Sequence, residues 1–300
     1  MRKLFLMFLV LNASIWAQSV MPQAPQETLN LAPRCQRGEA QTHRMQVEVL
    51  FLNDDGKPMA VKSNRISYTQ LCVANTPDSG LIYEITVDSF VIGTLRAIDQ
   101  SNYESFSLVD SLSGLHFRSQ YRSKIPVKGN CYDFGIPLTT GWPYMEAWEF
   151  IDDFLPAKIM EQLHYTVGRR LRKIGDTATI AWPKPICYEV QNVVKTSRVD
   201  QKPFKLTLTG LTSYRGTPCA TVSIASAISP YRVDMYTPDT TFFKALGTSQ
   251  ITGELQVSLK NGNIVYAKMS ERLETNLTET GLPARKNRVI KNTELIPRVW

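Results

Sequence analysis

The chain has little of what the common catalytic folds require. It contains only three histidines, His43, His116 and His164, spread over 300 residues. It has no Gly-x-Ser-x-Gly elbow, no Gly-x-Gly-x-x-Gly turn, no phosphate-binding loop and no Cys-x-x-Cys pair. These absences argue against α/β-hydrolase, nucleotide-binding, redox and zinc-knuckle chemistry. We therefore expect a non-enzymatic protein with no catalytic residues, no bound metal and no cofactor.

Long apolar runs are also scarce, and the one prominent run lies near the N-terminus. Arg2 and Lys3 precede an apolar run from Leu4 to Leu11, and small and polar residues then lead to Ala17. This order is typical of a secretory signal peptide, here residues 1–17. The run is too short for a helix that spans a bilayer. We expect a soluble exported protein, periplasmic or secreted, with no transmembrane span in the mature chain.

The excess of positive charge is small. The chain carries 34 Lys and Arg against 27 Asp and Glu. Basic residues gather at Arg169, Arg170, Arg172 and Lys173, and again near the C-terminus. In an exported protein such patches favour an anionic lipid or an acidic envelope-protein surface over nucleic acid. A solvated face without a partner is the simpler interpretation of each patch.

The chain has five cysteines, and an odd number leaves at least one thiol without a partner in the chain. An oxidising compartment permits disulfides between the others. A strand expected at 204–211 would separate Cys187 from Cys219 by more than the ~7 Å that a disulfide bridges. The sequence favours no particular pairing among Cys35, Cys72, Cys131, Cys187 and Cys219.

Hydrophobic patterning predicts a mainly β fold with one or two curved antiparallel sheets. Residues from Met45 onward alternate as strands do, and this pattern returns after Asp176. Between them, apolar residues three or four apart predict a helical segment near 144–172, packed against the sheets, which Pro156 should kink or split. The expected segments are a signal peptide (1–17), an extended arm (18–44), an N-terminal β half (45–140), a helical connector (141–175), a C-terminal β half (176–280) and a basic tail (281–300).

One local signal predicts a tight hairpin. Lys260-Asn-Gly-Asn263 lies between two alternating runs. A type I′ turn needs positive φ at both central residues, and it therefore favours Asn-Gly at these positions.

Three weak constellations could carry chemistry. Glu161 and His164 share a helical face, but a di-iron site needs ligands from several helices. Cys131 with His164 could form a thiol nucleophile and base. Asp176-Thr-Ala178 matches an aspartic-protease triplet, whose chemistry needs a second such carboxylate. We interpret all three as structural.

The second half resembles poorly characterised exported bacterial β-rich proteins with a lipoprotein-carrier-like fold. The resemblance is carried by the stretches Leu208-Thr-Gly-Leu-Thr-Ser-Tyr-Arg-Gly-Thr-Pro-Cys-Ala220 and Gly253-Glu-Leu-Gln-Val-Ser-Leu-Lys-Asn-Gly-Asn-Ile-Val-Tyr-Ala267. It implies a half-barrel with an apolar concave face and no catalytic machinery.

These observations favour an exported binding or envelope-assembly protein. The candidate ligand-binding face is the apolar side of the helix, where an apolar ligand could lie between helix and sheet. Two alternatives stay open: an interaction or scaffold protein that docks through its arm and tail, and a hydrolase that uses Asp176 or Cys131. The residues of the candidate face are Trp148, Ile151, Phe154 and Leu155.

Overall fold

The structure is a computed structural model of the chain. It describes residues 28–77, 80–98, 106–122, 127–128, 131–132, 144–182, 186–190, 194–198, 202–236 and 242–298. The predicted signal peptide lies outside these residues. Most described residues are in strands, joined by one α-helix, α2 (Tyr144–Val167), and one short 3-10 helix, η1 (Asp110–Leu112). The strands are β1 (Ala40–Leu52), β2 (Pro58–Thr76), β3 (Gly80–Gly93), β4 (Arg96–Ala97), β5 (Phe106–Leu108), β6 (His116–Tyr121), β7 (Val127–Lys128), β8 (Cys131–Tyr132), β9 (Thr177–Ile180), β10 (Ile186–Val190), β11 (Val194–Arg198), β12 (Phe204–Tyr214), β13 (Thr217–Ser226), β14 (Ser229–Tyr236), β15 (Phe242–Ser258), β16 (Ile264–Glu279) and β17 (Arg285–Arg298).

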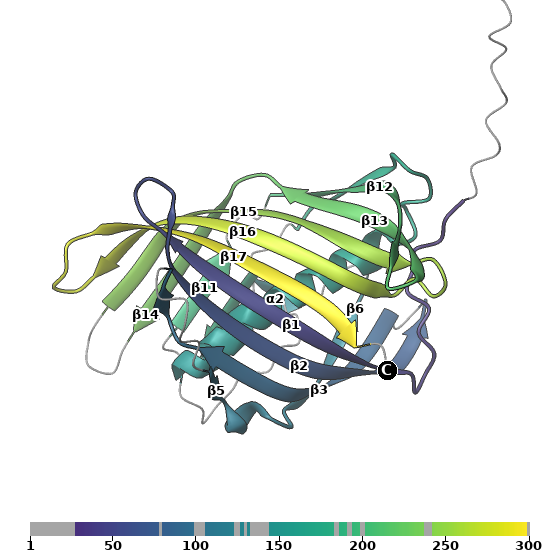
Figure 1. Cartoon of the computed structure of the whole chain (residues 1–300), viewed down its shortest axis with the longest axis horizontal. Coiled ribbons are helices and arrows are strands. Elements are labelled where there is room, and N and C mark those ends of the chain that lie inside the picture. The colour runs from purple at the N-terminus through teal and green to yellow at the C-terminus, as the bar shows by residue number, and fades with distance from the viewer. Residues whose placement is uncertain are drawn as a thin grey trace, which may run out of the picture.

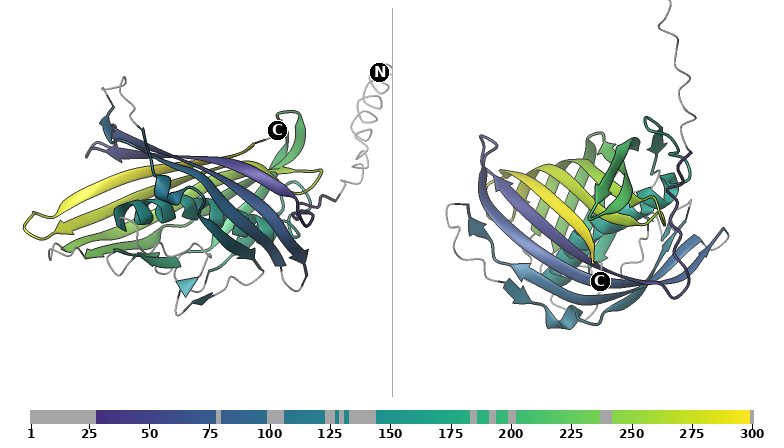
Figure 2. Two further views of the ribbon diagram at one scale, coloured as in Figure 1. Left: turned by 90° about the horizontal axis from the view of Figure 1, so that it is seen from below. Right: turned by 45° about the vertical axis from the view of Figure 1, so that its right-hand side comes forward.

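Strand pairing joins these elements into one large sheet. Its main path runs β6, β3, β2, β1, β17, β16, β15, β13, β12, β9. The first part of β15 pairs instead with β14, from which a branch continues through β11, β10 and β8 to β7. The pairs are antiparallel except β8 with β10. Figure 2 shows the sheet curving as an open trough around α2. The mainly β fold with a helix packed against a curved antiparallel sheet confirms the predicted fold class.

The two predicted β halves form one continuous sheet, because the first strand pairs with the last. β1 lies between β2 and β17 over most of its length. Residues 285–298, expected in a basic tail, are therefore a central strand (Figure 1). Its inward positions are Val289, Lys291, Thr293 and Leu295, all buried. Two of these four are polar, so the alternation that marks a strand is hidden in the sequence.

The predicted arm also ends earlier than expected, since β1 begins at Ala40. The inward positions of β1 include His43, Met45 and Val47, all buried. Because His43 is polar, its inward position is invisible to hydrophobic patterning. The remaining described part of the arm, residues 28–39, is termed the strap. It crosses the end of α2, where the Leu31 backbone N–H donates to the Gly168 carbonyl at 3.1 Å.

Helix α2 lies on the concave side of the sheet and is buried on most of its surface (Figures 1 and 2). It continues through Pro156 without a break, so the predicted division of the helix is wrong. Proline lacks the N–H that would bond the carbonyl four residues earlier, that of Asp152. In this protein the Lys291 ammonium donates to the Asp152 carbonyl at 2.9 Å. A sheet side chain thus supplies the donor that the proline lacks.

The same lysine anchors the helix by charge. The Lys291 ammonium is paired with the carboxylate of Asp152 and lies 2.8 Å from that of Asp153. Asn64 of β2 donates to Asp153 at 2.6 Å and to Glu149 at 2.7 Å. Burial opposes the charge of Lys291, but the two carboxylates outweigh it and raise its pKa. The carboxylates in the first half of the helix therefore bind the sheet.

The predicted type I′ turn is found in a different hairpin from the one that the sequence indicates. β15 and β16 are joined at the predicted Asn-Gly, but positive φ occurs at Gly262 and not at Asn261. The turn between β12 and β13 has positive φ at both Arg215 (48°) and Gly216 (81°). The type I′ pattern therefore falls at Arg215-Gly216, while residues 259–263 form a longer hairpin loop.

Gly168 permits the strap to pass close to the end of α2. A Cβ atom at this position would lie 2.6 Å from the Leu31 carbonyl oxygen. We expect Gly168→Ala to lower the free energy of unfolding by about 1–3 kcal/mol, because backbone must move to relieve the overlap. Gly210→Ala is the matched control, since a Cβ there meets open space. Equal denaturant midpoints for the two variants would contradict this account of the contact.

Candidate functional site

The helix face predicted to bind an apolar ligand lies in the protein core. Ile151, Phe154 and Leu155 are buried, and Trp148 is partly buried against the same cluster. The Phe154 ring packs edge-on against Tyr68 at a centroid distance of 4.9 Å and stacks on Phe150 at 5.5 Å. The space around this face is thus occupied by aromatic side chains of the protein. Binding of an apolar ligand at this face stays a prediction.

A buried polar cluster begins one turn farther along α2. Lys158 is fully buried, and its ammonium donates to the Tyr121 hydroxyl at 2.7 Å and lies 3.3 Å from the Glu161 carboxylate. Tyr121 donates a short hydrogen bond to Glu161, and Gln70 donates to the other carboxylate oxygen at 2.6 Å. Burial opposes the charge of Glu161, but Lys158 and the hydrogen bonds from Tyr121 and Gln70 together exceed this effect and lower the pKa of Glu161. The cluster holds a compensated ion pair inside the trough.

Lys158 also contacts aromatic rings. Its ammonium lies 5.1 Å from the ring centroid of Phe154 and 5.3 Å from that of Tyr121. Burial is the main influence on Lys158 and lowers its pKa, with Glu161 opposing. Aromatic faces and one carboxylate therefore replace the water that a surface lysine would keep.

A small cavity, here called the polar chamber, adjoins this cluster. Its volume is about 30 Å³. It lies between the sheet and α2, with the strap at one side. The lining residues are Pro33, Gln41, His43, Gln70, Leu81, Tyr83, Tyr121, Glu161, His164, Asn263, Ile264 and Leu295.

The two buried histidines of the chamber are neutral at neutral pH. Burial lowers the pKa of His43 to about 4, although Glu161 opposes this shift. Burial likewise lowers the pKa of His164 to about 4. The His164 Nε2–H donates to the Leu31 carbonyl of the strap at 2.9 Å. His164 therefore fixes the strap. The side chain of Cys131 lies outside the described part of the structure, so the thiol and base pair stays a prediction.

A larger cleft opens on the outer side of the strap. Its volume is about 710 Å³, within the range of small-molecule sites. Three exposed arginines line it, Arg34 from the strap and Arg169 and Arg172 from the segment after α2. Its lining residues include no carboxylate. This arginine cleft is lined by Thr28, Leu29, Asn30, Ala32, Pro33, Arg34, Cys35, Asn75, Gly168, Arg169 and Arg172.

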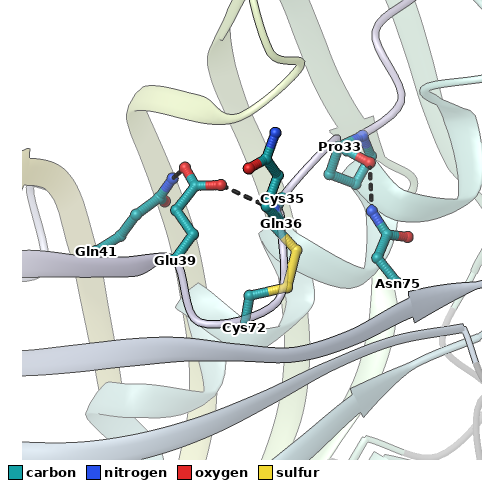
Figure 3. Close-up of a disulfide and its surroundings, with 7 residues drawn as sticks. All are labelled: Pro33, Cys35, Gln36, Glu39, Gln41, Cys72 and Asn75. Carbon is teal, nitrogen blue, oxygen red and sulfur yellow. Dashed lines mark hydrogen bonds between the residues drawn. A yellow bond between two sulfur atoms is a disulfide. The ribbon is translucent and has the colours of Figure 1, made fainter.

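A disulfide ties the strap to the sheet beside the cleft. Cys35 is joined to Cys72 of β2, 37 residues away (Figure 3). The Asn75 side-chain amide donates to the Pro33 carbonyl at 3.0 Å, and the Glu39 carboxylate accepts from the Gln36 backbone N–H at 2.9 Å. Closing a loop of this length is worth about 4 kcal/mol in the chain-entropy model. Cys219 is a buried free thiol, and the side chains of Cys131 and Cys187 lie outside the described residues.

The aspartic-protease triplet is part of a turn. The Asp176 carboxylate accepts from the backbone N–H groups of Arg172 at 2.7 Å and Lys173 at 2.8 Å. These two bonds lower the pKa of Asp176. The carboxylate is thus engaged in closing the turn before β9, as expected for a structural role.

The polar cluster was missed in the sequence, although one signal was present. Lys158 is seven residues after Ile151 and four after Phe154, on the same apolar face of the helix. A lysine at such a position marks a buried charge that needs a partner. The partners Tyr121 and Gln70 come from distant strands, and sequence spacing carries no information about them.

Within the described residues, no group of three or more His, Cys, Asp and Glu side chains could hold a metal ion. The helices there include none that is both long and apolar enough to cross a membrane.

Comparison with known proteins leaves the chain without an assigned family. No family model matches it, and no curated protein matches it. A solved structure of an AttH candidate from Nitrosomonas europaea is 8% identical, with 84% of this chain and 92% of that chain covered and a TM-score of 0.14. A similarity at this level carries no structural or functional argument. The resemblance to lipoprotein carriers remains a prediction.

The buried histidines predict a defined acid sensitivity. The unfolded chain takes up protons near pH 6.5, whereas the folded chain does so near pH 4, so stability is lost as the pH falls through this window. Each histidine contributes at most about 3 kcal/mol. We expect His43→Phe to reduce the slope of unfolding free energy against pH between these values. His116→Gln, at an exposed position, is the comparison variant. An unaltered slope in His43→Phe would contradict the assignment.

Proposed function

We propose that this is an exported, non-enzymatic binding protein that holds the anionic headgroup of a lipid in the arginine cleft. The single observation that carries the proposal is the cleft of about 710 Å³ lined by Arg34, Arg169 and Arg172 without a carboxylate. Guanidinium groups bind phosphate and carboxylate oxygens through paired N–H donors. An anion is therefore the ligand class that suits this surface.

The construction of the cleft supports a binding role. The Leu29 N–H donates to the Arg172 carbonyl at 2.9 Å, and the Arg34 N–H donates to the Asn261 carbonyl at 2.9 Å. With the disulfide at Cys35, these bonds hold the arginine-bearing segments in place. A pre-formed site costs less ordering on binding than a mobile one.

The Cys35–Cys72 disulfide supports export, because such bonds persist in oxidising compartments. Phe154 and its aromatic neighbours pack between the helix and the sheet. This packing favours a structural role for the helix face over a ligand-binding role. The cleft therefore replaces the helix face as the proposed position of the ligand.

The alternative of a scaffold protein that docks through free ends has less support. Residues 288–295 are paired on both sides within the sheet, the flanking residues of β17 are paired on one side, and residues 28–39 are tied to the end of α2 and to β2. Neither segment is available as a flexible docking peptide.

Vesicle binding tests the proposed function. The chain without residues 1–17 should float with phosphatidylcholine vesicles that contain phosphatidylglycerol, and not with phosphatidylcholine alone. Each arginine near an anionic surface contributes about 1 kcal/mol, so Arg169→Gln/Arg172→Gln should bind about 30-fold more weakly. Higher salt should weaken binding of the wild type.

Arg44→Gln is the control, because Arg44 is exposed on the outer face of β1, away from the residues that line the cleft. It should bind like the wild type. Competition by inorganic phosphate at millimolar concentration would assign the site to a free anion instead of a lipid. Equal binding by the cleft and control variants would refute the proposal.

A further inference from the structure

The polar chamber is a separate site from the arginine cleft. It lies under the strap, between β1, β2, β6 and α2, and Pro33 is the one lining residue shared with the cleft. Its contents are independent of the proposed function.

The size of the chamber limits what it can hold. A cavity needs roughly 10–15 Å³ to accept one water molecule. At about 30 Å³, the chamber accommodates about two molecules of that size. A lipid chain or a sugar does not fit.

Its lining has polar atoms without hydrogen-bonding partners among the described residues. Both atoms of the Asn263 side-chain amide are in this state, and so are both ring nitrogens of His43. Asn263 is 6% exposed and His43 is 3% exposed, so bulk solvent does not reach these atoms. Buried polar groups in folded proteins are nearly always hydrogen-bonded, to protein or to ordered water.

The chemistry of these atoms selects the ligand. The amide offers two donors and an acceptor, and a neutral imidazole offers one donor and one acceptor. The nearby charges of Lys158 and Glu161 already compensate each other at 3.3 Å, so no further ion is required. A small neutral molecule that both donates and accepts satisfies the lining.

We propose that the polar chamber binds two water molecules that bridge His43 of β1 and Asn263 of the 259–263 loop. These waters complete the hydrogen bonding of the two side chains and connect the first strand to the β15–β16 hairpin beneath the strap. Bound waters of this kind are structural parts of a protein.

A crystal structure of the chain without residues 1–17, at a resolution that shows ordered water, tests the proposal. Two density peaks are expected in the chamber, at hydrogen-bonding distance from the Asn263 amide and the His43 ring. Asn263→Leu should lose at least one peak and unfold at a midpoint about 2–4 °C lower. If this variant does not fold, His43→Phe provides the same test.

Ser119→Ala is the matched control. The Ser119 hydroxyl is also buried without a partner, but it does not line the chamber. This variant should keep both peaks and should not lower the midpoint. A chamber without density, direct bonds from Asn263 and His43 to protein groups, or an extended organic molecule in the density would each overturn the proposal.

Discussion

The structure depends on one interaction, the contact between Lys291 of β17 and the acidic first half of α2. This ammonium donates to the carbonyl that Pro156 leaves without its helical donor, and it pairs with the carboxylates of Asp152 and Asp153. A charge buried in this way is costly without partners, so each partner needs the others. The contact sets the helix against the centre of the sheet and permits a proline in the middle of a buried helix.

The position of the helix then determines where ligands can bind. With α2 seated in the trough, the aromatic side chains around Phe154 fill the space between helix and sheet. Two openings, the polar chamber and the arginine cleft, lie near the end of the helix, where the strap crosses it at Gly168. The strap has a small polar chamber on its inner side and an arginine-lined cleft on its outer side. The disulfide at Cys35 holds this partition to β2.

The sequence predicts the fold class, the helix and the hairpin at residues 260–263, because each has a local pattern. It does not predict β17, since Lys291 and Thr293 occupy inward positions that patterning assigns to the surface. The sequence wrongly predicts that Pro156 splits the helix. The donor that replaces the missing proline N–H is Lys291, which lies 135 residues away along the chain. The basic cluster at Arg169 and Arg172 is visible in the sequence, but its cleft needs Arg34 from the strap. The polar chamber is lined by residues of six strands, the helix and two loops, and no local spacing in the sequence encodes it.

The most direct test of the central claim is the equilibrium unfolding of Lys291→Met by denaturant. Loss of one member of a buried ion pair costs about 3–5 kcal/mol, and this loss is the predicted result. Lys286→Met is the comparison, because Lys286 is an exposed residue of the same strand and its replacement should change stability by less than about 0.5 kcal/mol. Equal stability of the two variants would contradict the claim that Lys291 holds the helix in the sheet.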